Sequence, residues 1–239
     1  MNELEKLEEK LKKAANPIKA KILQGFFKTG KGEYGEGDVF LGIIVPVQRK
    51  IAREFFELSI NEIQELLNSQ VHEKRLIALL ILIEKFRKAS KEKDEETRAK
   101  IFEFYLKNTK KINSWDLVDL SAQNIIGNYL LDKEKDILYE LAKSDNLWEK
   151  RISIVATFAF IRNNEYNHAL KISEILLEDS QDLIHKAVGW MLREIGKKNV
   201  EILEDFLGKY SSKMPRTMLR YAIERFDEEK RKRWLNGEM

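Results

Sequence analysis

The sequence predicts an all-α fold, and three observations support this expectation. Apolar residues recur at three- and four-residue spacing through most of the chain, which is the period of an amphipathic helix. Charged residues make up 35% of the 239 residues and only three residues are proline, a composition that favours helices over strands. Similar helical segments recur along the chain. A chain of this length buries a core without metals or disulfides, so we expect one domain over residues 1–239.

The N-terminal region is expected to form helix, then loop, then helix. Residues 2–24 carry apolar side chains at helical spacing, which predicts one buried stripe with a break near Pro17. The stripe consists of Leu4, Leu7, Leu11, Ala14, Ile18 and Ile22. Residues 29–38 contain four glycines and are therefore expected to form a loop. Helix is expected to resume near Pro46, because proline suits the first turn of a helix.

Five later segments share a polar or basic start followed by an apolar run. They begin at Val71, Asn113, Leu147, Leu183 and Met214, about 30 to 42 residues apart. This spacing is typical of two-helix solenoid repeats such as HEAT units. The sequence therefore predicts a HEAT-like repeat solenoid of stacked antiparallel helix pairs.

In such a stack, equivalent helices line one concave face, so their first turns are expected to point into a common basic groove. The cations that would contribute are Lys74, Arg75, Lys150, Arg151, Lys186, Arg216 and Arg220. Helix N-termini would add N–H donors suited to phosphate. The alternative is that these are ordinary solvated charges, since 43 Lys and Arg stand against 40 Asp and Glu and the net charge is only +3.

Several classes of protein are disfavoured by composition. The chain has no cysteine, which excludes disulfides, thiolate nucleophiles and cysteine-type zinc sites, and fits an intracellular location. The longest apolar run, residues 76–83, is too short to span a membrane, and the charged N-terminus does not read as an export signal. The three histidines, His72, His168 and His185, are scattered, so we expect surface or helix-start positions and no metal site.

Tryptophan placement indicates a candidate site. Trp115, Trp148 and Trp190 all lie in the recurring helix starts, beside charged residues. Trp115 and Asp119 are four residues apart, so an indole and a carboxylate share one helix face. Gly189 would permit a bulky group to approach the helix before Trp190. The alternative is that the indoles are interior packing and that Asp119 caps or pairs locally.

Four motifs carry a resemblance to a known family. They are Ser-Trp-Asp-Leu-Val-Asp at residues 114–119, Trp-Glu-Lys-Arg at 148–151, Lys-Ala-Val-Gly-Trp-Met-Leu-Arg-Glu at 186–194, and Phe-Leu-Gly-Ile-Ile-Val-Pro-Val-Gln-Arg at 40–49. In this order they resemble the DNA alkylation repair protein family, the AlkD-like HEAT-repeat DNA glycosylases. The resemblance covers nearly the whole chain.

The resemblance implies hydrolytic excision of cationic N3- or N7-alkylated purines from duplex DNA, without base flipping and without a metal or organic cofactor. By motif, Trp115 and Trp190 match the aromatic residues that pack on the backbone sugar of the damaged nucleotide. Asp119 matches the catalytic carboxylate and Arg151 a DNA-contacting arginine. The family's N-terminal aromatic contact would fall to Phe27 or Tyr34.

The implied partner is double-stranded DNA containing alkylated bases, with no membrane and no obligate protein partner. The implied location is cytoplasmic, at the nucleoid when the protein is bound to DNA. Two alternatives remain open. One is a non-catalytic protein that binds distorted or branched DNA, and the other is a HEAT scaffold whose groove takes a partner helix.

Overall fold

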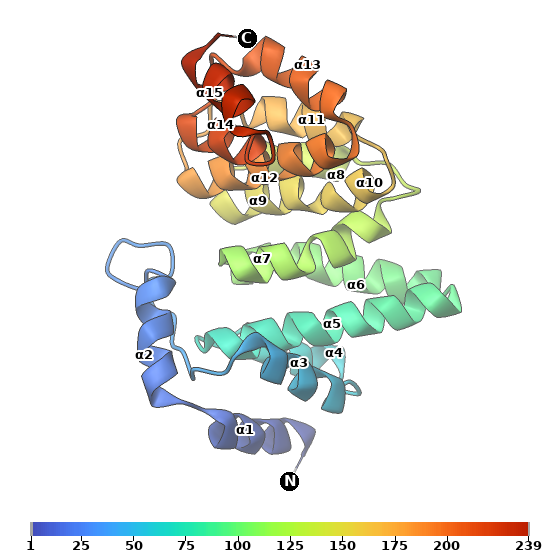
Figure 1. Ribbon diagram of the computed structural model, residues 1–239. Helices are drawn as coiled ribbons and strands as arrows, with labels where there is room; N and C mark the ends of the chain where they lie inside the picture. The colour runs from blue at the N-terminus through green and yellow to red at the C-terminus, as the bar shows by residue number, and fades with distance from the viewer. Residues whose placement is uncertain (1, 239) are drawn as a thin grey trace. The chain divides into compact units, whose positions relative to one another are not determined.

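The computed structural model describes residues 2–238, and its regular structure there is helical apart from one isolated bridge between Val39 and Val71 (Figure 1). The chain forms two compact units, Met1–Ser121 and Ala122–Met239. The expectation of one domain therefore stays a prediction. No helix within residues 2–238 combines the length and the apolar composition needed to cross a bilayer.

The first unit contains seven α-helices and one short 3₁₀ helix among its described residues. They are α1 (Glu3–Ala14), α2 (Pro17–Phe26), α3 (Val45–Glu54), α4 (Ile60–Leu67), α5 (His72–Glu92), α6 (Glu95–Lys107), η1 (Thr109–Lys111) and α7 (Trp115–Ser121). The long α5 is the centre of this unit and packs against α3, α4, α6 and α7. Its apolar run, residues 76–83, is at most 2% exposed, which explains why this segment is apolar on every side.

The second unit is also built from paired helices. Its elements are a π-helical turn η2 (Gln123–Gly127), α8 (Asp136–Ala142), α9 (Leu147–Ala156), α10 (Phe158–Arg162), α11 (Asn167–Ile175), α12 (Asp182–Lys198), α13 (Val200–Tyr210), α14 (Arg216–Ala222) and α15 (Glu228–Asn236). Here α12 is central and packs against α9, α11, α13 and α14. Both units thus consist of stacked helix pairs, as the HEAT-like prediction requires.

The predicted helix starts are confirmed. The five recurring segments begin α5, α7, α9, α12 and α14, each within two residues of the predicted start. The segment 29–38 contains turns and bends and no helix, and Pro46 lies in the first turn of α3. All three histidines lie in the first turn of a helix, although His72 is buried rather than at the surface.

The predicted N-terminal stripe is wrong in its second half. Leu7 and Leu11 are buried, but Ile18 is 76% exposed and Ile22 is 65% exposed. The prediction assumed one helical phase from residue 4 to residue 22. The chain instead ends α1 at Ala14 and starts α2 at Pro17, with Asn16 as the N-cap, so the apolar positions of α2 do not continue those of α1.

Gly189 permits the close approach that the sequence indicated, and the approaching group is helix α14. A Cβ atom at this position would lie 2.5 Å from the Met218 carbonyl oxygen and 2.5 Å from Tyr221 Cβ. Because such distances are far below van der Waals contact, only glycine lets α12 and α14 pack this tightly. This packing fixes the turn of α12 that carries Trp190.

Candidate functional site

Trp115, the first residue of α7, is held by two phenylalanines from the end of α2. The indole stacks on the Phe27 ring at 5.3 Å with an interplanar angle of 12°, and the Phe26 ring meets it edge-on at 5.9 Å. Phe27 in turn stacks on Phe40 at 5.0 Å. These contacts fix the orientation of the indole within the first unit.

Phe26 was missed by sequence reasoning, which proposed Phe27 or Tyr34 as the N-terminal aromatic contact. Phe27 is 7% exposed and serves as packing, whereas Phe26 is 63% exposed beside Trp115. Tyr34 is half-buried in the loop of residues 29–38, here called the glycine loop. If helical spacing is counted from Pro17, Phe26 follows Ile18 and Ile22 at four-residue intervals. Its exposure could therefore have been predicted together with theirs.

Asp119 lies one turn after Trp115, and the last residue of α7 is hydrogen-bonded to α6. The Tyr105 hydroxyl of α6 lies 2.8 Å from Ser121 Oγ, which itself donates to the Leu117 carbonyl oxygen at 2.5 Å. Burial raises the pKa of Tyr105, and the nearby charge of Asp119 raises it further despite the bond to Ser121. Tyr105 is therefore a neutral hydrogen-bonding support for α7.

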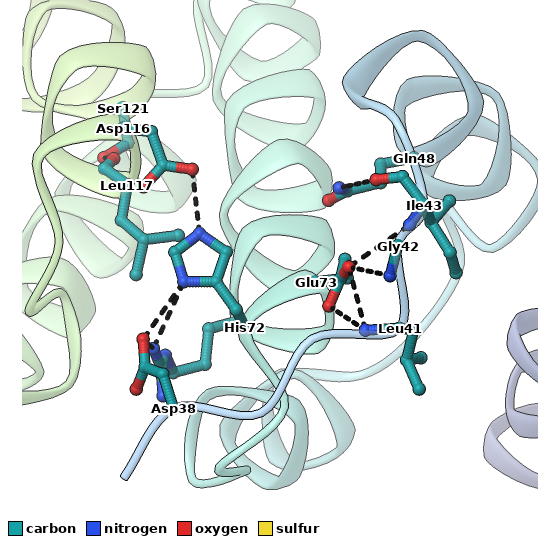
Figure 2. A network of polar contacts seen from close by, with 11 residues as sticks. Asp38, Leu41, Gly42, Ile43, Gln48, His72, Glu73, Asp116, Leu117 and Ser121 are labelled. Atoms are coloured by element: carbon teal, nitrogen blue, oxygen red, sulfur yellow. Dashed lines mark hydrogen bonds and ion pairs between the residues drawn. The ribbon is translucent and has the colours of Figure 1, made fainter. Parts of the chain in front are cut away.

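A buried polar network joins the first turn of α5 to α7 and to the end of the glycine loop (Figure 2). His72 Nε2 lies 2.8 Å from Asp116 Oδ2, and His72 Nδ1 lies 3.2 Å from Asp38 Oδ2. Arg75 donates from Nη2 to the same Asp38 oxygen at 2.6 Å. Burial would raise the pKa of Asp38, but bonding to His72 and Arg75 holds it below its usual value.

Glu73 binds the backbone next to this network. Its carboxylate accepts N–H groups from Leu41 and Gly42 at 3.0 and 2.8 Å and from Ile43 at 3.2 Å (Figure 2). Glu73 is 1% exposed, and these donors compensate its burial. The first turn of α5 therefore fixes the whole segment 38–43 that leads into α3.

The structure places Lys74 and Arg75 differently from the open groove expected for them. Arg75 is 4% exposed and also donates to the Ser69 carbonyl oxygen, so the expectation that its charge faces solvent is wrong. The physical reason is that the glycine loop ends in a buried carboxylate, Asp38, which takes the guanidinium. Lys74 forms an ion pair with Glu8 of α1. Contact of either cation with DNA stays a prediction.

In the second unit, the starts of α9 and α12 are tied together. Arg151 is 5% exposed and donates from Nη1 to the Leu183 carbonyl oxygen. Lys150 pairs with Asp179 at 2.7 Å, and Lys186 pairs with Asp182 at 2.6 Å. The bond to Asp182 raises the pKa of Lys186 above its ordinary value, so this side chain is a cation at neutral pH.

Trp190 and Arg216 lie further along the same unit. The Trp190 Nε1–H group donates to Glu194 Oε1 at 3.2 Å, and the ring lies 5.8 Å from that of Phe158. Arg216 donates to the Leu235 carbonyl oxygen at 2.5 Å. Trp148 differs from the other two tryptophans because it is buried, at 7% exposed.

The structure thus brings together Trp115 with Asp119, and Lys150 and Arg151 with the start of α12, each within its own unit.

Comparisons with known proteins bear on the family and the fold. A family model described as "DNA alkylation repair enzyme" matches residues 7–226. A solved structure described as a predicted DNA alkylation repair enzyme from Enterococcus faecalis has a TM-score of 0.67 at 16% identity, covering 90% of this chain and 97% of that one. The structure of smu.31 from Streptococcus mutans UA159 has a TM-score of 0.53 at 19% identity, covering 95% and 100%. No curated protein matches the sequence.

Proposed function

Because the chain belongs to the family of DNA alkylation repair enzymes, we propose that it is a DNA N-glycosylase that removes cationic N3- or N7-alkylated purines from double-stranded DNA. The observation that carries the proposal is the first turn of α7. There, an indole held by Phe27 precedes a carboxylate by one helical turn, at Trp115 and Asp119. These are the two kinds of group that stabilise a developing sugar cation.

The chemistry requires little beyond that stabilisation. An alkylated purine already carries a positive charge, so the electron pair of the N-glycosidic bond leaves with the base and neutralises it. The sugar becomes an oxocarbenium-like cation, and water then adds to C1′ and loses a proton. We propose that Asp119 stabilises the cation and positions the water, and that the Trp115 indole packs against the sugar. The base would stay stacked, so no base pocket is needed.

The cations are proposed to hold the DNA backbone. Lys150 and Lys186 lie at the starts of α9 and α12, where helix N-termini also favour phosphate, and the buried Arg151 would hold these two helix starts together. Arg216 and Lys74 are proposed as further backbone contacts, whereas Arg75 is left out because its buried guanidinium is bound to Asp38. We further propose that Phe26 provides the N-terminal aromatic contact, because its exposed ring lies against Trp115.

The test is release of methylated purine from duplex DNA treated with a methylating agent. Wild-type protein is compared with Asp119→Asn and with Glu103→Gln, which alters an exposed carboxylate of the same unit. We expect Asp119→Asn to abolish most release while DNA binding persists, and Glu103→Gln to behave like wild type.

Each other outcome supports a different conclusion. Release by Asp119→Asn at the wild-type rate would show that the assigned carboxylate is wrong. DNA binding by the wild type without any release would indicate a non-catalytic protein for distorted or branched DNA. Absence of DNA binding near physiological salt would favour the scaffold that takes a partner helix.

A further inference from the structure

We infer that His72 is a positioning residue for the α7 site, acting as an imidazolium that ties the first turn of α7, through Asp116, to the end of the glycine loop, through Asp38. The inference rests on the proposed function for its effect on excision. Its effect on the orientation of Trp115 can be measured separately.

The ring geometry favours a doubly protonated histidine. Both ring nitrogens face carboxylate oxygens, at 2.8 Å to Asp116 and 3.2 Å to Asp38. A neutral imidazole has only one N–H group, so one carboxylate would then face a lone pair. His72 is 2% exposed and both carboxylates are buried, so solvent does not compensate such a loss.

The ring also contacts the aromatic support of Trp115. His72 stacks on Phe40 at 4.7 Å and lies 4.9 Å from Phe27, the same ring on which Trp115 stacks. A cation is attracted to the faces of these rings. His72 is therefore connected to Trp115 in two ways. It contacts Asp116, the residue that follows Trp115, and it contacts Phe27, the ring on which Trp115 stacks.

The charges around His72 favour the imidazolium. Asp38 faces it from the loop and Asp116 from α7, while Arg75 of α5 lies 3.5 Å from Nδ1 and opposes its charge. Glu73, the next residue, is bound to backbone N–H groups of Leu41 and Gly42. Burial lowers the pKa of His72, but the bonds to Asp116 and Asp38 outweigh it and raise the pKa to about 9.

Loss of the proton should loosen α7 rather than unfold the loop. Arg75 continues to hold Asp38, and Glu73 continues to hold segment 41–43, because neither contact depends on the imidazolium. Asp116 has no second donor, since its Oδ1 is buried without a hydrogen-bond partner in the part of the chain that the structure describes, so a neutral Nε2–H group without its positive charge is then all that holds it. The tether that weakens is therefore the one next to Trp115.

The first readout is the orientation of Trp115. It is monitored by ¹⁹F NMR of protein labelled with fluorotryptophan, and the Trp115 resonance is identified by its absence in Trp115→Phe. Across about pH 6 to 10, the wild-type Trp115 resonance should shift with a midpoint near 9. In His72→Gln the shift should disappear, and in Asp116→Asn it should move to lower pH. His168→Gln, at the start of another helix, is the matched control and should leave the shift unchanged.

The second readout is single-turnover excision from methylated duplex at the same pH values, with protein-free DNA subtracted. Wild-type excision should fall about tenfold at one pH unit above the midpoint, whereas His72→Gln should be slower at neutral pH and lack this alkaline fall. A Trp115 resonance that does not respond to pH, or an alkaline fall retained in His72→Gln, would overturn the inference. If His72→Gln does not fold, the displaced midpoint of Asp116→Asn decides.

Failure of the proposed function gives a different pattern. The wild type would then release no base at any pH, while the Trp115 resonance would still titrate near 9 and lose this response in His72→Gln. That combination would retain His72 as the residue that positions Trp115 and reject the glycosylase.

Discussion

Phe26 and Phe27 are neighbours in sequence but have different surroundings, and substitutions should separate packing from DNA contact. Phe27 is 7% exposed between Trp115 and Phe40, so Phe27→Ala should destabilise the protein by about 3 to 5 kcal/mol. Phe26 is 63% exposed, so Phe26→Ala should cost less than about 1 kcal/mol but weaken excision. Urea denaturation and base release measure the two effects. Equal stability losses would contradict this assignment.

Gly42 provides a second contrast at the residue scale. Its φ of +79° is unfavourable for other residues, and a Cβ there would lie 2.1 Å from the Asn16 carbonyl oxygen. Gly37 has a φ of +85° but no atom within 4 Å of that position. Gly37→Ala should therefore cost about 1 to 2 kcal/mol, the left-handed penalty alone, and Gly42→Ala substantially more. If the denaturation midpoints of Gly37→Ala and Gly42→Ala fall equally, α2 moves away from segment 40–44 without a loss of stability.

At the scale of the element, the first turn of α5 makes stability depend on pH. The pKa of His72 rises from 6.5 to about 9 on folding, so its contribution is complete below about pH 6.5 and is lost as pH rises through 9. The difference corresponds to about 3 kcal/mol at most. The free energies of unfolding of wild type and His72→Gln, measured by urea denaturation, should converge above pH 9 and diverge below it. A constant difference across this range would contradict the assignment.

Glu73 supplies a prediction for the same turn that does not involve a proton. Glu73→Gln keeps the size of the side chain but replaces one acceptor oxygen with an NH₂ group, which cannot accept the N–H groups of Leu41, Gly42 and Ile43. We expect a loss of about 1 to 3 kcal/mol. Amide hydrogen exchange at residues 41–43 should accelerate more than exchange within α9. Unchanged protection there would mean that Glu73 does not anchor this segment.

The same element shows what sequence reasoning recovers. The start of α5 was predictable because a polar turn precedes an apolar run, and this pattern is local. The His72 network was not predictable, because its partners Asp38 and Asp116 lie 34 and 44 residues away and no periodicity reports such pairs. The exposure of Ile18 was missed because Pro17 resets the helical phase. The position of Trp115 and Asp119 on one helix was predictable because their four-residue spacing lies within a single local pattern.

At the scale of the whole molecule, the net charge of +3 gives little general attraction to DNA, so binding should depend on a few local cations. Lys186→Ala should weaken binding to duplex DNA and reduce the slope of log K against log salt by about 1. Lys209→Ala, which removes an exposed lysine from α13 of the same unit, is the control and should change neither. Identical slopes for Lys186→Ala and wild type would remove Lys186 from the proposed interface.

The anchoring of segment 38–43 also bears on how this protein diversifies. The glycine loop leaves α2 through a bond from Gly35 N–H to the Lys28 carbonyl oxygen and re-enters the helical framework at Asp38, where His72 and Arg75 hold it. With both ends fixed, doubling the number of intervening residues costs only about 0.6 kcal/mol in closure entropy. The framework therefore tolerates insertions here, and selection can vary the length and chemistry of the loop while the helices keep their register.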